Sequence, residues 1–296
     1  MNPTDVAAMD LPAGILAGPV RDAIEGTAWA LGPELVAAAG EVGTPLPRFP
    51  EAILAITLLE AAERAEGHLH SLAKPANGGP YESRIWALAA GWLRSRAVEL
   101  AAGLGSEYFQ RTSVALAKIA EGWMREARDL YDAGRTVDRY MAAVEGTRGA
   151  LGALAGALGG RQSGLDGEVV GRLAGAARGL AIAARLRDDL LDLTPSEDPG
   201  RAAGQSLAQG VYSLPVILSL ERDPGLAGSL GGAIAPASLA PLVERIWNAA
   251  GPLEARARCR SLTENALSAL AEIEATETLA GIGARIIDDC DSAVAG

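Results

Sequence analysis

The stretch that decides the fold of this chain runs from Arg185 to Asp192 and reads RLRDDLLD. It ends an apolar run that begins near Asp166. Four residues of that run recur at the three- and four-residue spacing of one helix face: Leu173, Ala177, Leu180 and Ala184. The pattern predicts a helix over residues 166–193 with a narrow apolar stripe that Leu191 closes.

Prolines and glycines divide the rest of the chain into further runs at helical spacing. They cover residues 51–67, 82–102, 106–132, 137–158, 207–220, 239–249, 252–273 and 276–294. Aromatic residues make up only 4% of the 296 residues, whereas strand-rich domains depend on aromatic and β-branched side chains. No composition shift or internal repeat divides the chain. We therefore predict an all-α fold, a single bundle of about ten or more helices, in one domain over residues 1–296.

Charge and composition exclude several classes of function. A net charge of −11 argues against nucleic acid as a partner, because a phosphate backbone requires a basic face. No apolar run is long enough for a membrane span and no basic segment opens the chain, so we expect neither a span nor a signal peptide. Cys259 and Cys290 lack metal-ligand spacing, and we expect them to be reduced and structural in a cytoplasmic protein.

Asp188, Asp189 and Asp192 are the candidate metal ligands. Carboxylates at positions i, i+1 and i+4 of a helix can hold a divalent cation, and such cations commonly bridge proteins to diphosphates. The helical spacing predicts Asp188 at the edge of the apolar stripe, Asp192 at its rim and Asp189 further round. Alternatively, the aspartates form a solvated helix end that pairs with Arg185 and Arg187.

The passage from Arg185 to Leu220 resembles the second aspartate-rich region of the trans-isoprenyl diphosphate synthases, the polyprenyl synthetase family. That region runs DDxxD, Gly-Lys, Gly-x-Asp-Leu and Gly-x-x-Thr-Leu-Pro. The corresponding segments here are DDLLD at 188–192, Gly-Arg at 200–201, GQSL at 204–207 and GVYSLP at 210–215. Weaker likeness lies in LAAGWLRSRA at 88–97 and in Leu-Gly-Pro at 31–33.

The resemblance implies an isoprenoid-synthase fold around a central apolar cavity. It also implies Mg²⁺ as cofactor, an allylic prenyl diphosphate as ligand, and two facing carboxylate clusters that hold about three Mg²⁺ on one diphosphate. The retained motif assigns Asp188, Asp189 and Asp192 to metal. Arg148 and Arg201, which stand at positions of family lysines or beside them, are assigned to diphosphate.

The first aspartate-rich motif of the family is absent. Residues 59–68 read LEAAERAEGH, with no aspartate. Trp29 and Gly32 replace the family's Lys and Arg before Pro33, and Ser206 replaces the aspartate after the second motif. These changes remove nearly every group that would bind isopentenyl diphosphate.

Glutamates at the place of the lost motif offer a replacement. Glu60, Glu63 and Glu66 form an acidic row on one helical face, and His68 and His70 follow. Glu63 and Glu66 are therefore further candidate metal ligands. The alternative is an exposed acidic face that runs into a loop. Separately, we expect Arg94 and Arg96 of the neighbouring run to be solvated, as lone arginines usually are.

Two functions remain open. The first is a divergent Mg²⁺-dependent prenyltransferase that uses a different acceptor, or cyclises its substrate with none. The second is a non-catalytic or regulatory subunit of a heteromeric prenyl diphosphate synthase. We expect a homodimer, or a heterodimer with an active prenyl synthase.

Overall fold

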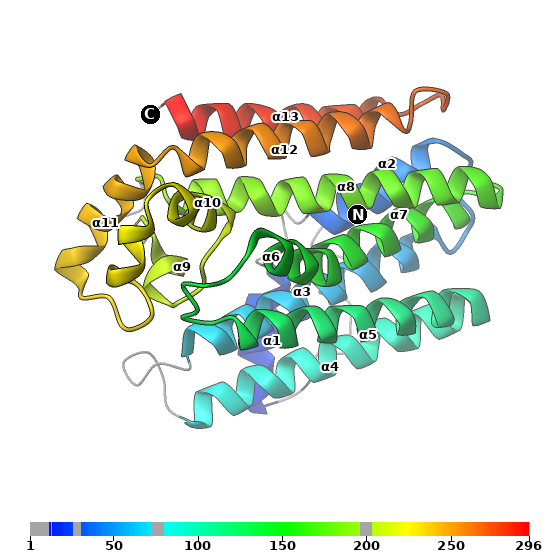
Figure 1. The fold of residues 1–296 in the computed structure, drawn as a ribbon. Helices are drawn as coiled ribbons and strands as arrows, with labels where there is room; N and C mark the ends of the chain where they lie inside the picture. The colour runs from blue at the N-terminus through cyan, green and yellow to red at the C-terminus, as the bar shows by residue number, and fades with distance from the viewer. Residues whose placement is uncertain (1–11, 13, 26–30, 73–79, 196–202, 296) are drawn as a thin grey trace. The chain divides into compact units, whose positions relative to one another are not determined.

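The computed structural model describes residues 12, 14–25, 31–72, 80–195 and 203–295 (Figure 1). Within these ranges all regular structure is helical, with thirteen α-helices and a few short 3₁₀ and π turns. The prediction of an all-α chain of ten or more helices is confirmed. The predicted helix 166–193 is α8 (Gly167–Asp192). In the described part of the chain, no helix has the length and hydropathy needed to cross a membrane.

The chain divides into two compact units. The first comprises residues 1–116, 151–177 and 272–276. Its longest helices, α3 (Phe49–Leu72) and α4 (Pro80–Leu104), pack along one another. Helices α1 (Ala17–Glu25) and α2 (Leu31–Glu41) pack against α3. This unit also contains the start of α5 (Ser106–Arg128), most of α7 (Ala150–Arg161) and the first part of α8.

The second unit comprises residues 117–150, 178–271 and 277–296. It takes the later part of α5 (Ser106–Arg128), α6 (Val137–Val144), the rest of α8, α9 (Gln205–Ala208) and α10 (Leu214–Arg222). Helices α11 (Pro236–Asn248), α12 (Gly251–Ser268) and α13 (Glu277–Ala295) follow. Helix α12 packs against both α10 and α13. The prediction of one domain over the whole chain stays a prediction.

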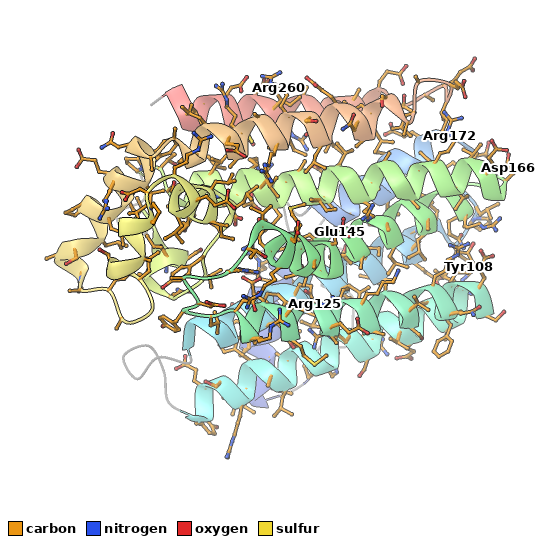
Figure 2. The ribbon with its side chains drawn as sticks, viewed as in Figure 1. Tyr108, Arg125, Glu145, Asp166, Arg172 and Arg260 are labelled. Carbon is orange, nitrogen blue, oxygen red and sulfur yellow. The ribbon has the colours of Figure 1, made fainter. Side chains whose placement is uncertain are left out.

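A π-helical turn (Glu145–Gly149) interrupts the run predicted at 137–158. It forms where the backbone passes close to α5, since a Cβ on Gly146 would lie 2.9 Å from the Cα of Gly122. A side chain at either glycine would push the two segments apart. Glu145, labelled in Figure 2, opens this turn. It binds Arg178 of α8 at 2.7 Å. The π turn therefore lies against α8 in the second unit, the helix that carries the aspartates.

Candidate functional site

Asp189 is the buried member of the aspartate motif. It is 4% exposed, and one of its carboxylate oxygens accepts a hydrogen bond from the Tyr140 hydroxyl of α6. The other oxygen lies 3.0 Å from Nε of Arg185, one turn earlier on α8. The structure corrects the predicted orientation, in which Asp188 bordered the buried face. The buried face is broader than the expected stripe and includes Ile182 and Leu186, which places Asp189 inside it.

Burial dominates the electrostatics of Asp189. It raises the pKa of the carboxyl to about 6, against the opposing effects of the Arg185 charge and the Tyr140 hydrogen bond. Burial likewise raises the pKa of Tyr140 well above its usual value, so its hydroxyl stays protonated and remains a donor. Both oxygens of Asp189 are therefore engaged by protein groups.

Asp188 and Asp192 lie one turn apart on the same side of α8. The side chain of Asp188 is 51% exposed and pairs with Arg187 at 2.8 Å. Asp192 is half-buried, and its carboxylate accepts the backbone N–H of Ser206 at 3.1 Å. Its carbonyl oxygen accepts the N–H of Gly204 at 2.6 Å. Asp192 thus fixes the start of α9, within the family-like GQSL segment.

Asp188 and Asp192 can hold Mg²⁺ only together with other ligands, such as substrate phosphates and waters. The described residues contain no group of three or more His, Cys, Asp or Glu side chains arranged to hold a metal ion. Mg²⁺, however, is commonly held by one or two carboxylates together with substrate phosphates and waters. Residues at i and i+4 of a helix are neighbours on its surface. Asp188 and Asp192 therefore suit a Mg²⁺–diphosphate complex, and a cage built by the protein alone is not present in the described ranges.

A buried ionic network behind Tyr140 was not predicted from the sequence. The Arg135 side chain is 1% exposed, pairs with Glu126 at 2.5 Å and donates to the carbonyl oxygen of Tyr212 at 3.0 Å. Its guanidinium also lies 5.2 Å from the centre of the Tyr140 ring. Arg135 thereby holds the ring that hydrogen-bonds Asp189 and the GVYSLP segment in one arrangement.

The network extends to Asp129, whose side chain is fully buried. Asp129 pairs with Arg139 and lies 3.5 Å from Arg135. Burial opposes ionisation of this carboxyl, but its hydrogen bonds to Arg128 and Arg139 lower its pKa overall. These residues come from the end of α5 and the start of α6, where Thr136 caps α6 by accepting the N–H of Arg139 at 3.3 Å. Only this cap has a local sequence signal.

Of the two arginines predicted to bind diphosphate, the structure describes only Arg148. Arg148 lies half-buried in the π-helical turn, and in the described ranges no hydrogen bond or ion pair joins it to the aspartates of α8. Arg201 lies outside the described residues, as do the side chains of His68 and His70. Their assigned roles remain predictions.

The glutamate row of the first unit is engaged by structural partners. Arg94 of α4 binds Glu66 at 2.6 Å and Glu63 at 3.3 Å. The Glu63 side chain is only 4% exposed. The alternative of an exposed acidic face and the expectation of a solvated Arg94 are therefore wrong for this pair, because the two helices pack along one another and bury it.

Glu60 has a different structural task. Its carboxylate accepts the backbone N–H of Gly32 at 2.9 Å, in the first turn of α2. N–H groups of a first helical turn have no partner within their own helix, so a carboxylate is stabilising there. A Cβ at residue 32 would lie 2.7 Å from this carboxylate oxygen. The glycine that replaces a family arginine therefore admits Glu60 to the backbone.

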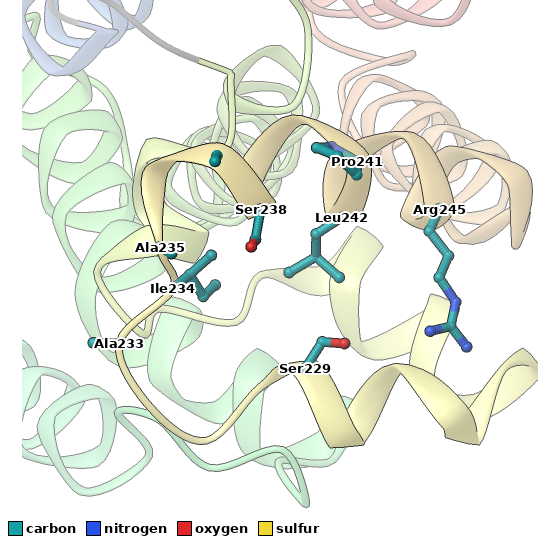
Figure 3. Close-up of a pocket in the computed structure, with 9 residues that line it drawn as sticks. Ser229, Ala233, Ile234, Ala235, Ser238, Pro241, Leu242 and Arg245 are labelled. Carbon is teal, nitrogen blue, oxygen red and sulfur yellow. The ribbon is translucent and has the colours of Figure 1, made fainter.

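One pocket of the second unit lies between the 3₁₀ turn Pro224–Ser229, the following loop and α11 (Figure 3). Its volume is about 570 Å³. It contains none of the residues predicted for the site. Of the nine residues that line it, Arg245 alone is charged, and its guanidinium makes two hydrogen bonds to Asp223. Among the described residues, the lining of this pocket therefore offers no carboxylate for Mg²⁺, and its one arginine is engaged by Asp223.

A comparison of this sequence with models of known protein families identifies the family of the chain. The model of the polyprenyl synthetase family matches residues 81–234, more than half of the chain. The chain belongs to the polyprenyl synthetase family.

Curated relatives are prenyl diphosphate synthases. The chain is 29% identical over 150 residues to a nonaprenyl diphosphate synthase of Mycobacterium tuberculosis, covering 50% of this chain and 45% of the relative. It is 26% identical over 193 residues to the chloroplastic solanesyl diphosphate synthase 1 of Arabidopsis thaliana, covering 64% and 48%. The matched part thus spans about half the length of these relatives.

Solved structures confirm the fold. A polyprenyl synthase from Caulobacter crescentus, complexed with calcium and isoprenyl diphosphate, superposes with a TM-score of 0.83 at 21% identity over 99% of this chain and 92% of that one. The heptaprenyl diphosphate synthase of Staphylococcus aureus gives 0.82 at 15% identity over 96% and 94%. The predicted isoprenoid-synthase fold is confirmed. The central apolar cavity stays a prediction.

Proposed function

We propose that this chain binds the diphosphate of one allylic prenyl diphosphate through Mg²⁺ held by Asp188 and Asp192, as a divergent prenyltransferase. The observation that carries this proposal is the geometry at the end of α8. Two carboxylates lie one turn apart on one side of the helix, and the buried Asp189 between them is anchored by Tyr140 and Arg185. Membership of a family whose curated relatives are prenyl diphosphate synthases supports it.

The residues of the site divide into ligands and positioning groups. Asp188 and Asp192 would supply the oxygen ligands. Asp189 would position them, because its contacts with Tyr140 and Arg185 fix the rotation of the end of α8. When bound, Mg²⁺ neutralises the diphosphate and assists its departure from the allylic carbon. Arg148 and Arg201 are proposed to bind diphosphate oxygens, for which the planar guanidinium is well suited.

The acceptor differs from that of the family. The positions that would bind isopentenyl diphosphate carry Trp29, Gly32 and Ser206 in place of charged residues. Gly32 now serves the contact with Glu60. We therefore propose that the allylic substrate reacts with another acceptor, or cyclises with none.

The test is calorimetric titration with a non-hydrolysable thiolo analogue of farnesyl diphosphate, with and without Mg²⁺. We expect a micromolar Kd, about −8 kcal/mol, that requires Mg²⁺. Asp192→Ala is expected to weaken it at least 30-fold. Asp289→Asn is the matched comparison, because Asp289 is 49% exposed and pairs with the same Arg187 as Asp188 but lies outside the motif. Since it acts only through Arg187, it should change the affinity far less than Asp192→Ala. Equal affinity of wild type and Asp192→Ala would overturn the proposal.

A second candidate is favoured by one observation, the pairing of Arg94 with Glu63 and Glu66. A site that holds three metals needs a second carboxylate cluster, and here the glutamates at that place bind an arginine. We therefore retain a non-catalytic subunit of a heteromeric prenyl diphosphate synthase as the alternative. Co-expression with each prenyl synthase of the source genome, followed by light scattering, tests it. A stable heteromer with altered product length supports the subunit role, and a homodimer that leaves every synthase unchanged contradicts it.

Cellular location belongs to the same proposal. The acidic chain, with no membrane-spanning helix in its described ranges, is proposed to act in the cytoplasm as a homodimer or heterodimer.

A further inference from the structure

Two buried thiols of the second unit lie in direct contact. Cys259 of α12 and Cys290 of α13 are 0% and 1% exposed, and their Sγ atoms are 3.1 Å apart. Cys290 donates to the sulfur of Cys259, and Cys259 in turn donates to the carbonyl oxygen of Ala183 on α8 at 3.3 Å. No disulfide joins them in the structure. The sequence did not indicate that they would meet, because 31 residues separate them.

Ion pairs beside the thiols fix the register of the two helices. Arg260 of α12, labelled in Figure 2, binds Asp291 of α13 at 2.5 Å. Arg256 lies 3.9 Å from the same carboxylate. Asp291 directly follows Cys290, and Cys259 lies between the two arginines in sequence. The thiols are therefore held opposite one another.

We propose that Cys259 and Cys290 are a dithiol modification site, which a peroxide closes to a reversible disulfide between α12 and α13. A disulfide has an S–S bond of about 2.05 Å, so the sulfurs need to approach by about 1 Å. Side-chain rotation together with a small shift of α13 toward α12 would bring the two sulfurs this close.

The oxidation balances with hydrogen peroxide as the oxidant. One thiolate sulfur attacks a peroxide oxygen, which breaks the O–O bond, gives a sulfenic acid and releases hydroxide. The second sulfur then displaces the hydroxyl from the sulfenic sulfur and forms the S–S bond. The two thiol protons leave in two molecules of water, the dithiol loses two electrons and the peroxide is reduced. Because both sulfurs are buried, the oxidant enters through local opening of the helix pair, and oxidation is slow compared with that of an exposed thiol.

The dithiol is connected to the aspartate motif by a chain of contacts. Asp289, next to Cys290, binds Arg187 at 3.4 Å, and Arg187 binds Asp188 at 2.8 Å. Closing the disulfide moves this part of α13 and changes how Arg187 is shared between the two carboxylates. We expect the affinity for Mg²⁺ and the farnesyl analogue to change at least threefold. This last step rests on the proposed function, whereas formation of the disulfide does not.

The experiment incubates the full chain with stoichiometric hydrogen peroxide and follows its intact mass. We expect loss of two hydrogens per chain, a peptide linking Cys259 to Cys290, full reversal by dithiothreitol, and a melting temperature raised by about 5 °C or more. Cys290→Ser and Cys259→Ser serve as single-thiol controls and should lose no hydrogens within the chain. Oxidation to sulfinic or sulfonic acid, or only dimers linked between chains, would overturn the dithiol. A disulfide that forms but leaves binding of the farnesyl analogue unchanged would overturn the coupling through Arg187. If the reduced wild-type chain does not bind the analogue at all, that result contradicts the proposed function and not the disulfide.

Discussion

The aspartates of α8 and the glutamates of α3 are two sets of carboxylates that differ in how many of their members an arginine and burial engage. Each has one buried member beside an arginine, Asp189 with Arg185 and Glu63 with Arg94. On α8 the neighbouring Asp188 and Asp192 remain on the more accessible side. On α3 the neighbouring Glu66 shares the same guanidinium as Glu63. Burial beside an arginine converts a carboxylate into a structural group, so the residue type alone does not indicate a metal ligand.

Among single substitutions of these carboxylates, loss of Asp189 is expected to lower the free energy of unfolding most. Asp189→Ala leaves Arg185 without this carboxylate and the buried Tyr140 hydroxyl without its acceptor. We expect a loss of about 3 kcal/mol in the free energy of unfolding, measured by urea denaturation. Asp188→Ala, which removes an exposed ion pair, should cost less than about 0.5 kcal/mol. Equal losses for the two variants would show that Asp189 has no special structural role.

The corresponding change in the first unit is Glu63→Ala. The substitution removes a buried partner of Arg94 but leaves Glu66 in place, so we expect a loss of about 2 kcal/mol in urea denaturation. Glu66→Ala is the more exposed control and should cost about 1 kcal/mol or less. Neither variant should alter Mg²⁺-dependent binding of the farnesyl analogue. Loss of that binding in Glu63→Ala would assign the glutamate row to metal after all.

The third expected effect is the dependence of the free energy of unfolding on pH that Asp189 causes. Its folded pKa, about 6, is above the value of about 4 in the unfolded chain, so the folded state holds its proton over that interval. The contribution of Asp189 to stability is therefore complete below about pH 4 and decreases as pH rises to about 6, by up to about 2 kcal/mol. Asp189→Asn should remove this slope from urea denaturation curves collected at pH 4 to 7. If Asp189→Asn shows the same slope as wild type, a group other than Asp189 causes the pH dependence.

The sequence predicted the fold well because its evidence is local and repeated. Apolar residues at helical spacing identify α8 within a residue at each end, and the family motif identifies its aspartates. The sequence did not predict which aspartate is buried, because α8 buries more of its circumference than the stripe through Leu173 and Ala184 indicates.

The side chains that bind the buried carboxylates were harder to predict from the sequence. Pairing of the aspartates with Arg185 and Arg187 was one alternative from the sequence, and the i, i+4 pair of Arg185 with Asp189 is present in the structure. Tyr140 is 49 residues away from Asp189, and Arg94 is 28 and 31 residues away from Glu66 and Glu63. Pairs that tertiary packing brings together leave no periodic signal in one sequence.

The most direct test of the account is one calorimetric comparison of the farnesyl analogue with wild type, Asp188→Ala and Glu66→Ala, each with and without Mg²⁺. We predict micromolar, Mg²⁺-dependent binding to wild type and Glu66→Ala, and at least 30-fold weaker binding to Asp188→Ala. Binding that survives in Asp188→Ala, or that is lost in Glu66→Ala, would contradict the assignment of the metal site to α8.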